Sequence, residues 1–293
     1  MIGSRPKHPA IYSLVESGGK ARWAPVVAVV RLAWYIAGMK LISLQSGSNG
    51  NCIYVQARGV RLLFDAGISG SQAQQRLDGH NQAIRRVDAL LISHNHRDHA
   101  SGMGIFQRKF GLPIHVTRPT LDAAHSTMRL GKLSQVHHFT AGSTLDFGGV
   151  RVETIPTPHD GVDGVAFVVD DGHSRLGILT DLGHRFDHLA QVIGTLDAVL
   201  LESNYDPAML AGGSYPTFLK RRIAGRGGHL SNVEAAALLG SVPQGQLRWA
   251  CLGHLSEQNN TPELALQTHQ RVLGTRFPLV VASRYHTTDV LEV

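Results

Sequence analysis

Short apolar runs rich in Val, Ile, Leu and Phe recur along the chain after Met39, and many of them are separated by turns that contain Gly. Runs of this kind, bounded by turn-forming residues, are typical of β-strands. We therefore predict strands at residues 40–44, 52–57, 60–65, 89–93, 150–155, 165–169, 176–179, 198–201, 247–252 and 279–282.

Helix signals alternate with these predicted strands. Three helix starts carry capping patterns, namely Ser71 with Gln74, Ser231 with Glu234, and Thr261 followed by Pro262. We see no internal repeat and no linker after Met39. The alternation predicts one α/β domain over residues 39–293, with two strand-rich halves.

The first 38 residues differ from the rest of the chain. Residues 26–37 form an apolar stretch, but Arg31 interrupts it and it is shorter than the roughly 20 residues of a membrane-spanning helix. The polar stretch before it is long and lacks a clear cleavage site, which disfavours a signal peptide. The sequence MKLISL from Met39 resembles a natural protein start. We expect residues 1–38 to be an extension without fold value, and we expect no membrane association.

The composition of this 293-residue chain, 43% hydrophobic and 17% charged, is that of an ordinary globular protein and excludes a disordered, collagen-like or coiled-coil chain. A net charge of +6 with His neutral favours anionic partners such as phosphodiesters. Both cysteines, Cys52 and Cys251, lie in apolar runs, so we expect buried thiols. So few cysteines in a chain of this length indicate a reducing compartment, and we expect the cytoplasm.

The 17 His are the unusual part of the composition, and the densest group follows the predicted strand at 89–93. There His94, His96, Asp98 and His99 supply the imidazole nitrogens and carboxylate oxygen that divalent metals bind. Alternation along an extended segment would send the first three side chains to one side. His99 would then break the alternation at a turn, so that one segment serves two ions.

This pattern resembles the metallo-β-lactamase fold, and the resemblance covers essentially all of residues 39–293. The other matching motif residues are Asp65 in LLFDAG, His159 in TPHDG, Asp181 in ILTDLG and His254 in LGHLSEQNN. The resemblance implies an α/β fold, a four-layer αββα sandwich. The 72 residues between Asp181 and His254 cannot hold the large inserted domain of some nucleases of this superfamily.

The resemblance also implies two divalent metal ions per chain, Zn²⁺ first, with Mn²⁺ or Fe as alternatives. It assigns His94, His96 and His159 to one ion, Asp98, His99 and His254 to the other, Asp181 to both, and Asp65 to orienting the loop that holds them. The chemistry agrees, because two ions about 3.5–4 Å apart can hold both the attacking and the leaving oxygen of a displacement.

Departures from relatives narrow the function. His96 stands where oxygen-reducing diiron members carry Glu, which disfavours an oxidoreductase. Asp181 stands where antibiotic-destroying zinc β-lactamases carry Cys, which disfavours that activity. The stretches SLQSGSNGNCIYV, ESNYD at 202–206, GRGGHLSN at 225–232 and GHLSEQNNTPELA at 253–265 resemble the YycJ/WalJ-type proteins, bacterial members described as 5′-to-3′ DNA exonucleases. The resemblance implies a phosphodiester hydrolase with DNA or another phosphodiester as its partner.

His229 follows a basic run and precedes the predicted helix start at Ser231, where free N–H groups and positive potential suit a phosphate. In related phosphodiesterases a histidine here steadies the phosphoryl group or protonates the leaving oxygen. We expect Asp98 and His229 to be catalytic, with a packing role for His229 as the alternative. The residues expected to bind substrate are Ser48, Asn51, Asn204 and Arg226. A plain hairpin turn at 46–51 and a solvated basic face at 220–222 are the competing interpretations.

Three other functions compete with a DNA exonuclease. The same ligand set serves thioester or lactone hydrolases of the glyoxalase-II type, and it also serves phosphodiesterases of small nucleotides. A metal-stabilised binding module is the non-enzymatic alternative, although the complete ligand set argues against it. The sequence makes no prediction of an oligomeric state.

Overall fold

The computed structural model describes residues 12–17, 20–25 and 38–293. The chain divides into two compact units, residues 1–38 and 39–293. In the first unit, β1 (Tyr12–Ser17) pairs antiparallel with β2 (Lys20–Pro25), strands that the sequence did not predict. The apolar stretch at 26–37 lies outside the described residues. In the described ranges no helix is long and apolar enough to cross a membrane.

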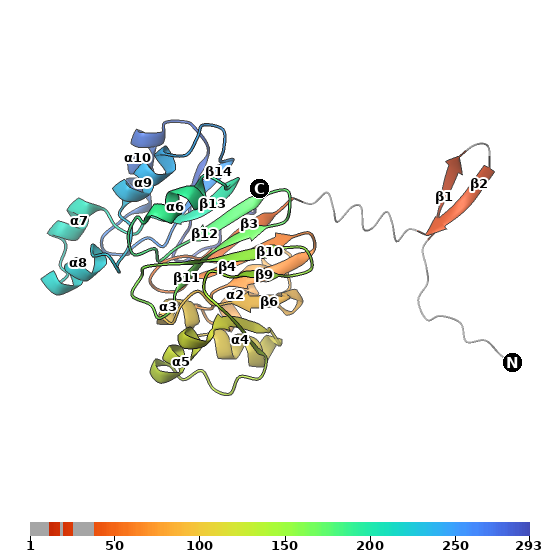
Figure 1. Ribbon diagram of the computed structural model, residues 1–293, viewed down its shortest axis with the longest axis horizontal. Helices are drawn as coiled ribbons and strands as arrows, with labels where there is room; N and C mark the ends of the chain where they lie inside the picture. Colours follow the sequence, from red (N-terminus) through yellow and green to blue (C-terminus); the bar gives the residue numbers. More distant parts are fainter. Residues whose placement is uncertain (1–11, 18–19, 26–37) are drawn as a thin grey trace. The chain divides into compact units, whose positions relative to one another are not determined.

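The second unit is built on two seven-stranded mixed sheets (Figure 1). The first sheet has the order β16-β3-β4-β5-β6-β7-β8, formed by Leu291–Glu292, Lys40–Gln45, Cys52–Ala57, Val60–Phe64, Ala89–Leu91, Ile114–Thr117 and Val136–Phe139. The second has the order β15-β14-β13-β12-β11-β10-β9, formed by Leu279–Val281, Trp249–Gly253, Ala198–Glu202, Arg175–Leu179, Val165–Asp170, Arg151–Pro156 and Thr144–Asp146. Every predicted strand is present, with ends shifted by at most two residues.

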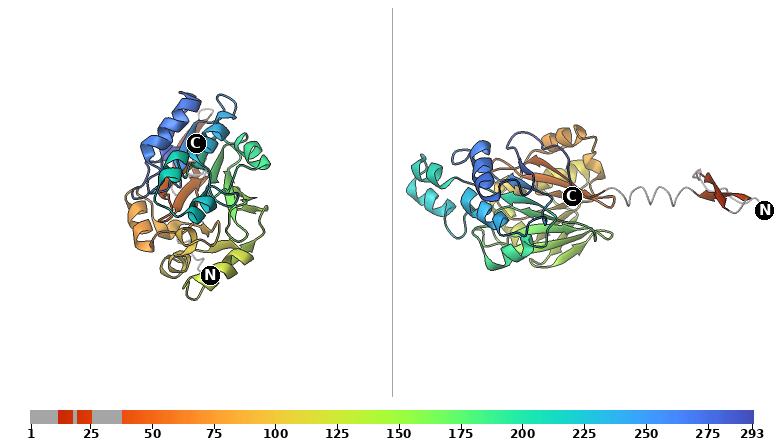
Figure 2. Two further views of the ribbon diagram at one scale, coloured as in Figure 1. Left: turned by 90° about the vertical axis from the view of Figure 1, so that its left-hand side faces the viewer. Right: turned by 90° about the horizontal axis from the view of Figure 1, so that it is seen from above.

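Helices cover the outer faces of the two sheets, as Figures 1 and 2 show. On the first sheet they are α2 (Gly70–Asp78), α4 (Met103–Phe110) and α5 (Arg118–Thr127), with a 3₁₀ turn at Ile84–Arg86. On the second they are α6 (Asp187–Ile193), α9 (Asn232–Gly240) and α10 (Pro262–Leu273). The short helices are α3 (Arg97–Ala100), α7 (Pro207–Gly212) and α8 (Thr217–Ile223).

Three apolar clusters hold these layers together. The central cluster joins the two sheets, where Phe64 of β5 meets Phe167 of β11 with ring centroids 5.0 Å apart. The two outer clusters fill the space between each sheet and its helices. Because strand side chains alternate between faces, each sheet supplies one face to the centre and one to its helices. The predicted four-layer αββα sandwich without a large inserted domain is therefore confirmed.

Helix starts were predicted well at two positions and wrongly at a third. Ser231 with Glu234 forms the predicted capping box of α9, and Thr261 caps α10. At α2, however, the capping box is Ser69 with Gln72, not Ser71 with Gln74. Both pairs fit the same Ser-x-x-Gln pattern, and the helix begins at the earlier pair, with Gly70, Ala73 and Leu77 buried.

Candidate metal centre

The predicted ligands lie at the ends of strands, on loops that converge at one edge of the sandwich. His94 follows β6, His159 follows β10, Asp181 follows β12 and His254 follows β14. The backbone is left-handed at Asp65, Asp181 and His254, with φ of 63°, 57° and 53°. Such conformations cost free energy in non-Gly residues and cluster at functional sites.

The histidine-rich segment changes conformation half-way along. His96 is extended, at φ −70° and ψ 151°, but α3 begins directly after it and carries Asp98 and His99. The predicted alternation through Asp98 is therefore wrong. The helical turn gives the backbone a hydrogen bond, from the Ala100 N–H to the His96 carbonyl. It also brings the rings of His94 and His99 to 4.2 Å between centroids.

The structure brings all seven predicted ligands together. Four sets of side chains have ligand atoms within 4.8 Å of one another, namely His94, His96 and His159; Asp98, His99 and His254; His94, His99 and Asp181; and Asp181, Glu202, His229 and His254. The first two sets coincide with the two ions expected from the sequence. Asp181 lies between them, with Oδ2 3.1 Å from His99 Nε2 and Oδ1 3.6 Å from His159 Nε2.

Asp65 organises the segment that carries the ligands. One carboxylate oxygen accepts from the Ser93 N–H at 2.8 Å, and the other accepts from the Ser93 hydroxyl at 2.9 Å. The second oxygen also lies 2.7 Å from His99 Nδ1, so this ring nitrogen carries a proton. His99 therefore presents Nε2 to the centre. This is the orienting role that the resemblance implies for Asp65.

Other ligand rings are held in the same way, through the nitrogen that faces away from the centre. His159 Nδ1 donates to the Gly228 carbonyl at 2.7 Å, and His96 Nε2 lies 3.3 Å from Asp160 Oδ1. The opposite nitrogens of these two rings face each other at 3.2 Å. Histidine ligands in proteins are oriented by such outer hydrogen bonds.

The donor set fits divalent metal ions. His94 is buried, and its Nε2 has no hydrogen-bond partner among the described residues, which is costly unless an ion binds there. Burial lowers the pKa of His94, His96 and His159, so these imidazoles are neutral and able to ligate. Mixed nitrogen and carboxylate ligation suits Zn²⁺, Mn²⁺ or Fe.

In the second set of predicted ligands, the pKa of the histidines is raised instead of lowered. Burial alone would lower the pKa of His99 and His254, but the carboxylates around them, Asp181 first, raise it, for His254 to about 10. Burial alone would raise the pKa of Asp98 and Asp181, but the neighbouring histidines lower it well below the ordinary value. Positive charge is therefore stabilised where the second ion is expected.

A buried carboxylate that the sequence analysis missed joins His229 to the centre. Glu202, at the end of β13, is fully buried, and its Oε1 accepts from His229 Nδ1 at 2.6 Å. Its Oε2 accepts from the backbone N–H groups of Leu182 and Leu230. Burial alone would raise the pKa of Glu202, but His229 and His254 lower it to about 2. His229 is thus held by an anion, with Nε2 left for substrate.

Asp160 is the second residue that the sequence analysis missed. Besides meeting His96, its carboxylate accepts from Arg222 Nε at 2.6 Å. The sequence contained a signal for each of these two residues. Asp160 is a carboxylate directly after the predicted ligand His159, and Glu202 stands at the end of a predicted strand.

The residues predicted to bind substrate occupy different environments. Ser48 and Arg226 are exposed near the centre, on the 46–51 loop and the loop after α8. Asn51 and Asn204 are buried. The Asn51 amide donates to the Asp98 carbonyl at 3.2 Å and lies 2.9 Å from His99 Nε2, and the Asn204 amide donates to the His254 carbonyl at 2.8 Å.

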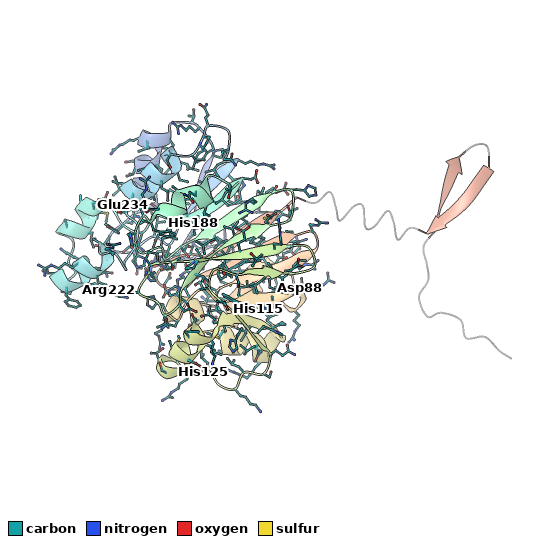
Figure 3. All side chains as sticks on the ribbon, in the orientation of Figure 1. Asp88, His115, His125, His188, Arg222 and Glu234 are labelled. Carbon is teal, nitrogen blue, oxygen red and sulfur yellow. The ribbon has the colours of Figure 1, made fainter. Side chains whose placement is uncertain are left out.

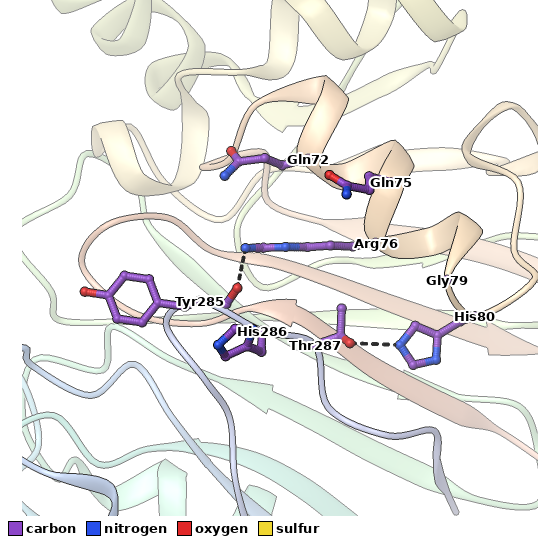
Figure 4. Close-up of a pocket in the computed structure, with 8 residues that line it drawn as sticks. All are labelled: Gln72, Gln75, Arg76, Gly79, His80, Tyr285, His286 and Thr287. Carbon is purple, nitrogen blue, oxygen red and sulfur yellow. Dashed lines mark hydrogen bonds between the residues drawn. The ribbon is translucent and has the colours of Figure 1, made fainter.

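A separate cavity of about 540 Å³ lies between α2 and the C-terminal segment (Figure 4). Arg76 spans it by donating to the Tyr285 carbonyl at 2.7 Å, and His80 contacts Thr287 at 3.0 Å. None of the seven predicted ligands lines this cavity.

Comparisons with known proteins agree with this geometry. The Beta-lactamase superfamily domain matches residues 60–250. The chain belongs to the beta-lactamase superfamily. Within it, the chain is 37% identical over 235 residues to "Exodeoxyribonuclease WalJ" of Streptococcus pneumoniae, covering 79% of this chain and 87% of the relative. It is 33% identical over 253 residues to "Exodeoxyribonuclease YycJ" of Bacillus anthracis, covering 86% and 96%.

Solved structures of the superfamily share the fold. The metallo-β-lactamase fold protein YhfI from Bacillus subtilis aligns with a TM-score of 0.68 at 17% identity, covering 88% of this chain and all of that chain. Zn²⁺-bound PqqB from Methylobacterium extorquens aligns with a TM-score of 0.64 at 17% identity, covering 85% and 99%. At such identities the likeness shows the fold alone.

Proposed function

We propose that this protein is a metal-dependent phosphodiesterase that removes nucleotides from DNA ends. The observation that carries the proposal is the pairing of a two-part ligand cluster, joined by Asp181, with the His229–Glu202 pair beside it. The names of its relatives in Streptococcus pneumoniae and Bacillus anthracis support DNA as the substrate.

Each side chain then has a defined task. His94, His96 and His159 would hold one ion, Asp98, His99 and His254 the other, and Asp181 both. Bound there, the two ions would neutralise phosphate charge and favour the attack of water on phosphorus. Because Nδ1 of His229 is engaged by Glu202, a proton on Nε2 can pass to the leaving oxygen.

The supporting residues keep this arrangement rigid. Asn51 and Asn204, which were predicted to contact substrate, are better placed to hold the backbone of Asp98 and His254. The exposed Ser48 and Arg226 can contact the DNA strand. We place the protein in the cytoplasm, because Cys52 and Cys251 are free and buried, as in proteins of reducing compartments.

Hydrolysis of model substrates tests the proposal. The metal-loaded protein, with Mn²⁺ or Zn²⁺, should cleave bis(p-nitrophenyl) phosphate much faster than a thioester, and it should shorten end-labelled DNA stepwise. Fast thioester cleavage without phosphodiester cleavage would contradict the proposal in favour of the glyoxalase-II type. Metal analysis of the same sample identifies the ion.

A further inference from the structure

Helix α8 projects beside the metal centre without taking part in the core. Figures 1 and 2 show α7 and α8 standing out from the sandwich, and no residue of α8 is buried. Phe218 of α8 has 72% of its surface exposed, more than any other large apolar side chain in the described part of the chain. A helix that buries nothing and exposes an aromatic ring is not explained by packing.

The far end of α8 is attached directly to the site. Arg222 donates to Asp160 at 2.6 Å, and Asp160 meets His96. The N–H of His229 donates to the carbonyl of Ile223, the last residue of α8. Figure 3 labels Arg222 on this helix. The helix is therefore fixed at the edge of the centre through two independent contacts.

The face of α8 that meets the site also carries Phe218. Residues three and four apart lie on the same side of a helix, so Phe218, Arg221 and Arg222 share one face. Phe218 lies roughly 7 Å along the axis from Ile223, at about 1.5 Å per residue. At about 3.4 Å per stacked nucleotide, this length of α8 corresponds to roughly two nucleotides of a strand lying along it.

We propose that α8 is the landing surface for a single DNA strand entering the centre, with a base stacked on Phe218 and phosphates held by Arg221 and Arg226. This inference rests on the proposed phosphodiesterase function and assigns its substrate contact. Arg221 and Arg226 are exposed, and their guanidinium groups have no partner among the described residues. An exposed ring one helical turn from the free guanidinium group of Arg221, with Arg226 on the loop that follows the helix, matches the way proteins bind single strands, by base stacking and phosphate contacts. A duplex would not offer Phe218 an unpaired base.

The test compares two substrates in the full-length, metal-loaded protein. Phe218→Ala should raise KM for an oligodeoxythymidylate by roughly 5- to 100-fold. Cleavage of bis(p-nitrophenyl) phosphate, which is too small to reach α8, should not change. Phe218→Trp should restore the KM, because indole also stacks on bases. Val272→Ala on α10, which removes another exposed apolar side chain, is the matched control and should change neither reaction.

Direct binding separates this inference from the proposed function. A fluorescein-labelled phosphorothioate oligodeoxythymidylate, followed by anisotropy, should bind more weakly to Phe218→Ala whether or not the protein cleaves phosphodiesters. Arg221→Gln should flatten the slope of log Kd against log salt by about 0.7, the loss of one phosphate contact. Arg271→Gln on α10 is its control.

Three results would overturn the inference. One is an unchanged Kd and salt slope in both α8 variants. Another is an equal loss of both cleavage reactions in Phe218→Ala, which would make Phe218 a support of the centre. The third is a change of oligomeric state in Phe218→Ala with unchanged DNA binding, which would assign α8 to contacts between copies of the chain. A wild-type protein that binds the oligonucleotide through α8 but cleaves no phosphodiester would instead contradict the proposed function alone.

Discussion

At the scale of single residues, the centre is a small group of oppositely charged side chains, all buried except the partly exposed Asp98. Asp98, Asp181 and Glu202 are carboxylates with lowered pKa, and His254 between them has a raised one. Each charge is stabilised by its neighbours rather than by water, so the removal of one exposes the others to the full cost of burial.

Asp181→Ala should release at least one metal ion and nearly abolish turnover. This carboxylate is the one that reaches ligands of both sets. The fold should persist, because Asp181 itself belongs to none of the apolar clusters; its neighbour Leu182, which does, is unchanged. Metal analysis, circular dichroism and bis(p-nitrophenyl) phosphate turnover check this. Normal activity with two ions retained would contradict the bridging role.

His229→Ala should slow turnover by about 10²–10³-fold while both ions stay bound. In the proposed mechanism the seven ligand positions are filled by other residues and His229 protonates the leaving oxygen, so kcat should fall more than KM rises. Glu202→Gln should also lower kcat, because the neutral amide holds the His229 Nδ1 proton less strongly than the carboxylate does. Loss of an ion in His229→Ala would make it a ligand, and unchanged turnover would make it a packing residue.

That the seven proposed ligands lie together could be predicted from the sequence, because each stands in a short motif at a strand end that matches the family. The positions of Glu202 and Asp160 next to such motifs were signals in the sequence, but their partners could not be predicted, because those depend on which loops become neighbours. Glu202 reaches His229 and His254 since β13 lies between β12 and β14, an order that no local pattern encodes.

At the scale of elements, the start of α2 is fixed by the capping box of Ser69 and Gln72. Ser69→Ala should lower the free energy of unfolding by about 0.5–2 kcal/mol, because it removes the cap on the Gln72 N–H. Ser71→Ala, two residues on, is the matched control and should change it by less than about 0.5 kcal/mol. Urea unfolding measures both. Equal effects would place the start of α2 elsewhere.

Helix α10 contains a buried histidine with its own pH dependence. His269 is fully buried, its Nδ1 donates to the Ala265 carbonyl, and its Nε2 has no partner in the described part of the chain. Burial lowers the pKa of His269 below its unfolded value near 6.5, so the unfolded chain takes up the proton first. Its contribution to stability is present above about pH 6.5 and is lost as the pH falls towards the folded pKa.

The free energy of unfolding of His269→Leu, measured relative to the wild type, should therefore be higher at pH 5.5 than at pH 7.5. Urea unfolding in EDTA at both pH values measures this, and EDTA removes the effect of metal binding. The exposed His125→Gln is the control and should track the wild type. A pH-independent difference between His269→Leu and the wild type would contradict a buried neutral His269.

Most strands and two helix caps could be predicted because period and capping are local properties. The helices between β6 and β8, and α6, α7 and α8, were not predicted. Helices α7 and α8 are only six and seven residues long. Their apolar face is too short for a helical period to show, and α8 buries nothing, so hydrophobic patterning carries no signal there.

At the scale of the whole molecule, the centre joins the two sheets. The segment from His94 to His99 follows β6 of the first sheet, while Asp181 and His254 follow β12 and β14 of the second. Bound ions would therefore link both halves of the sandwich in addition to the central apolar cluster. Since a preformed site does not exist in the unfolded chain, metal affinity adds to folding stability.

Chelation should accordingly lower the melting temperature of the entire 39–293 unit in one cooperative step. At a free metal concentration 100-fold above Kd, one ion adds about 2.7 kcal/mol, and each kcal/mol shifts Tm by about 2–4 °C in a domain near this size. Calorimetry with and without EDTA should thus show a fall of at least about 5 °C, reversed by added Zn²⁺ or Mn²⁺. Asp181→Ala should show a smaller fall, because it binds fewer ions. A Tm that EDTA leaves unchanged, in protein shown to have lost two ions, would mean that the ligand loops close equally well without metal and do not tie the sheets together.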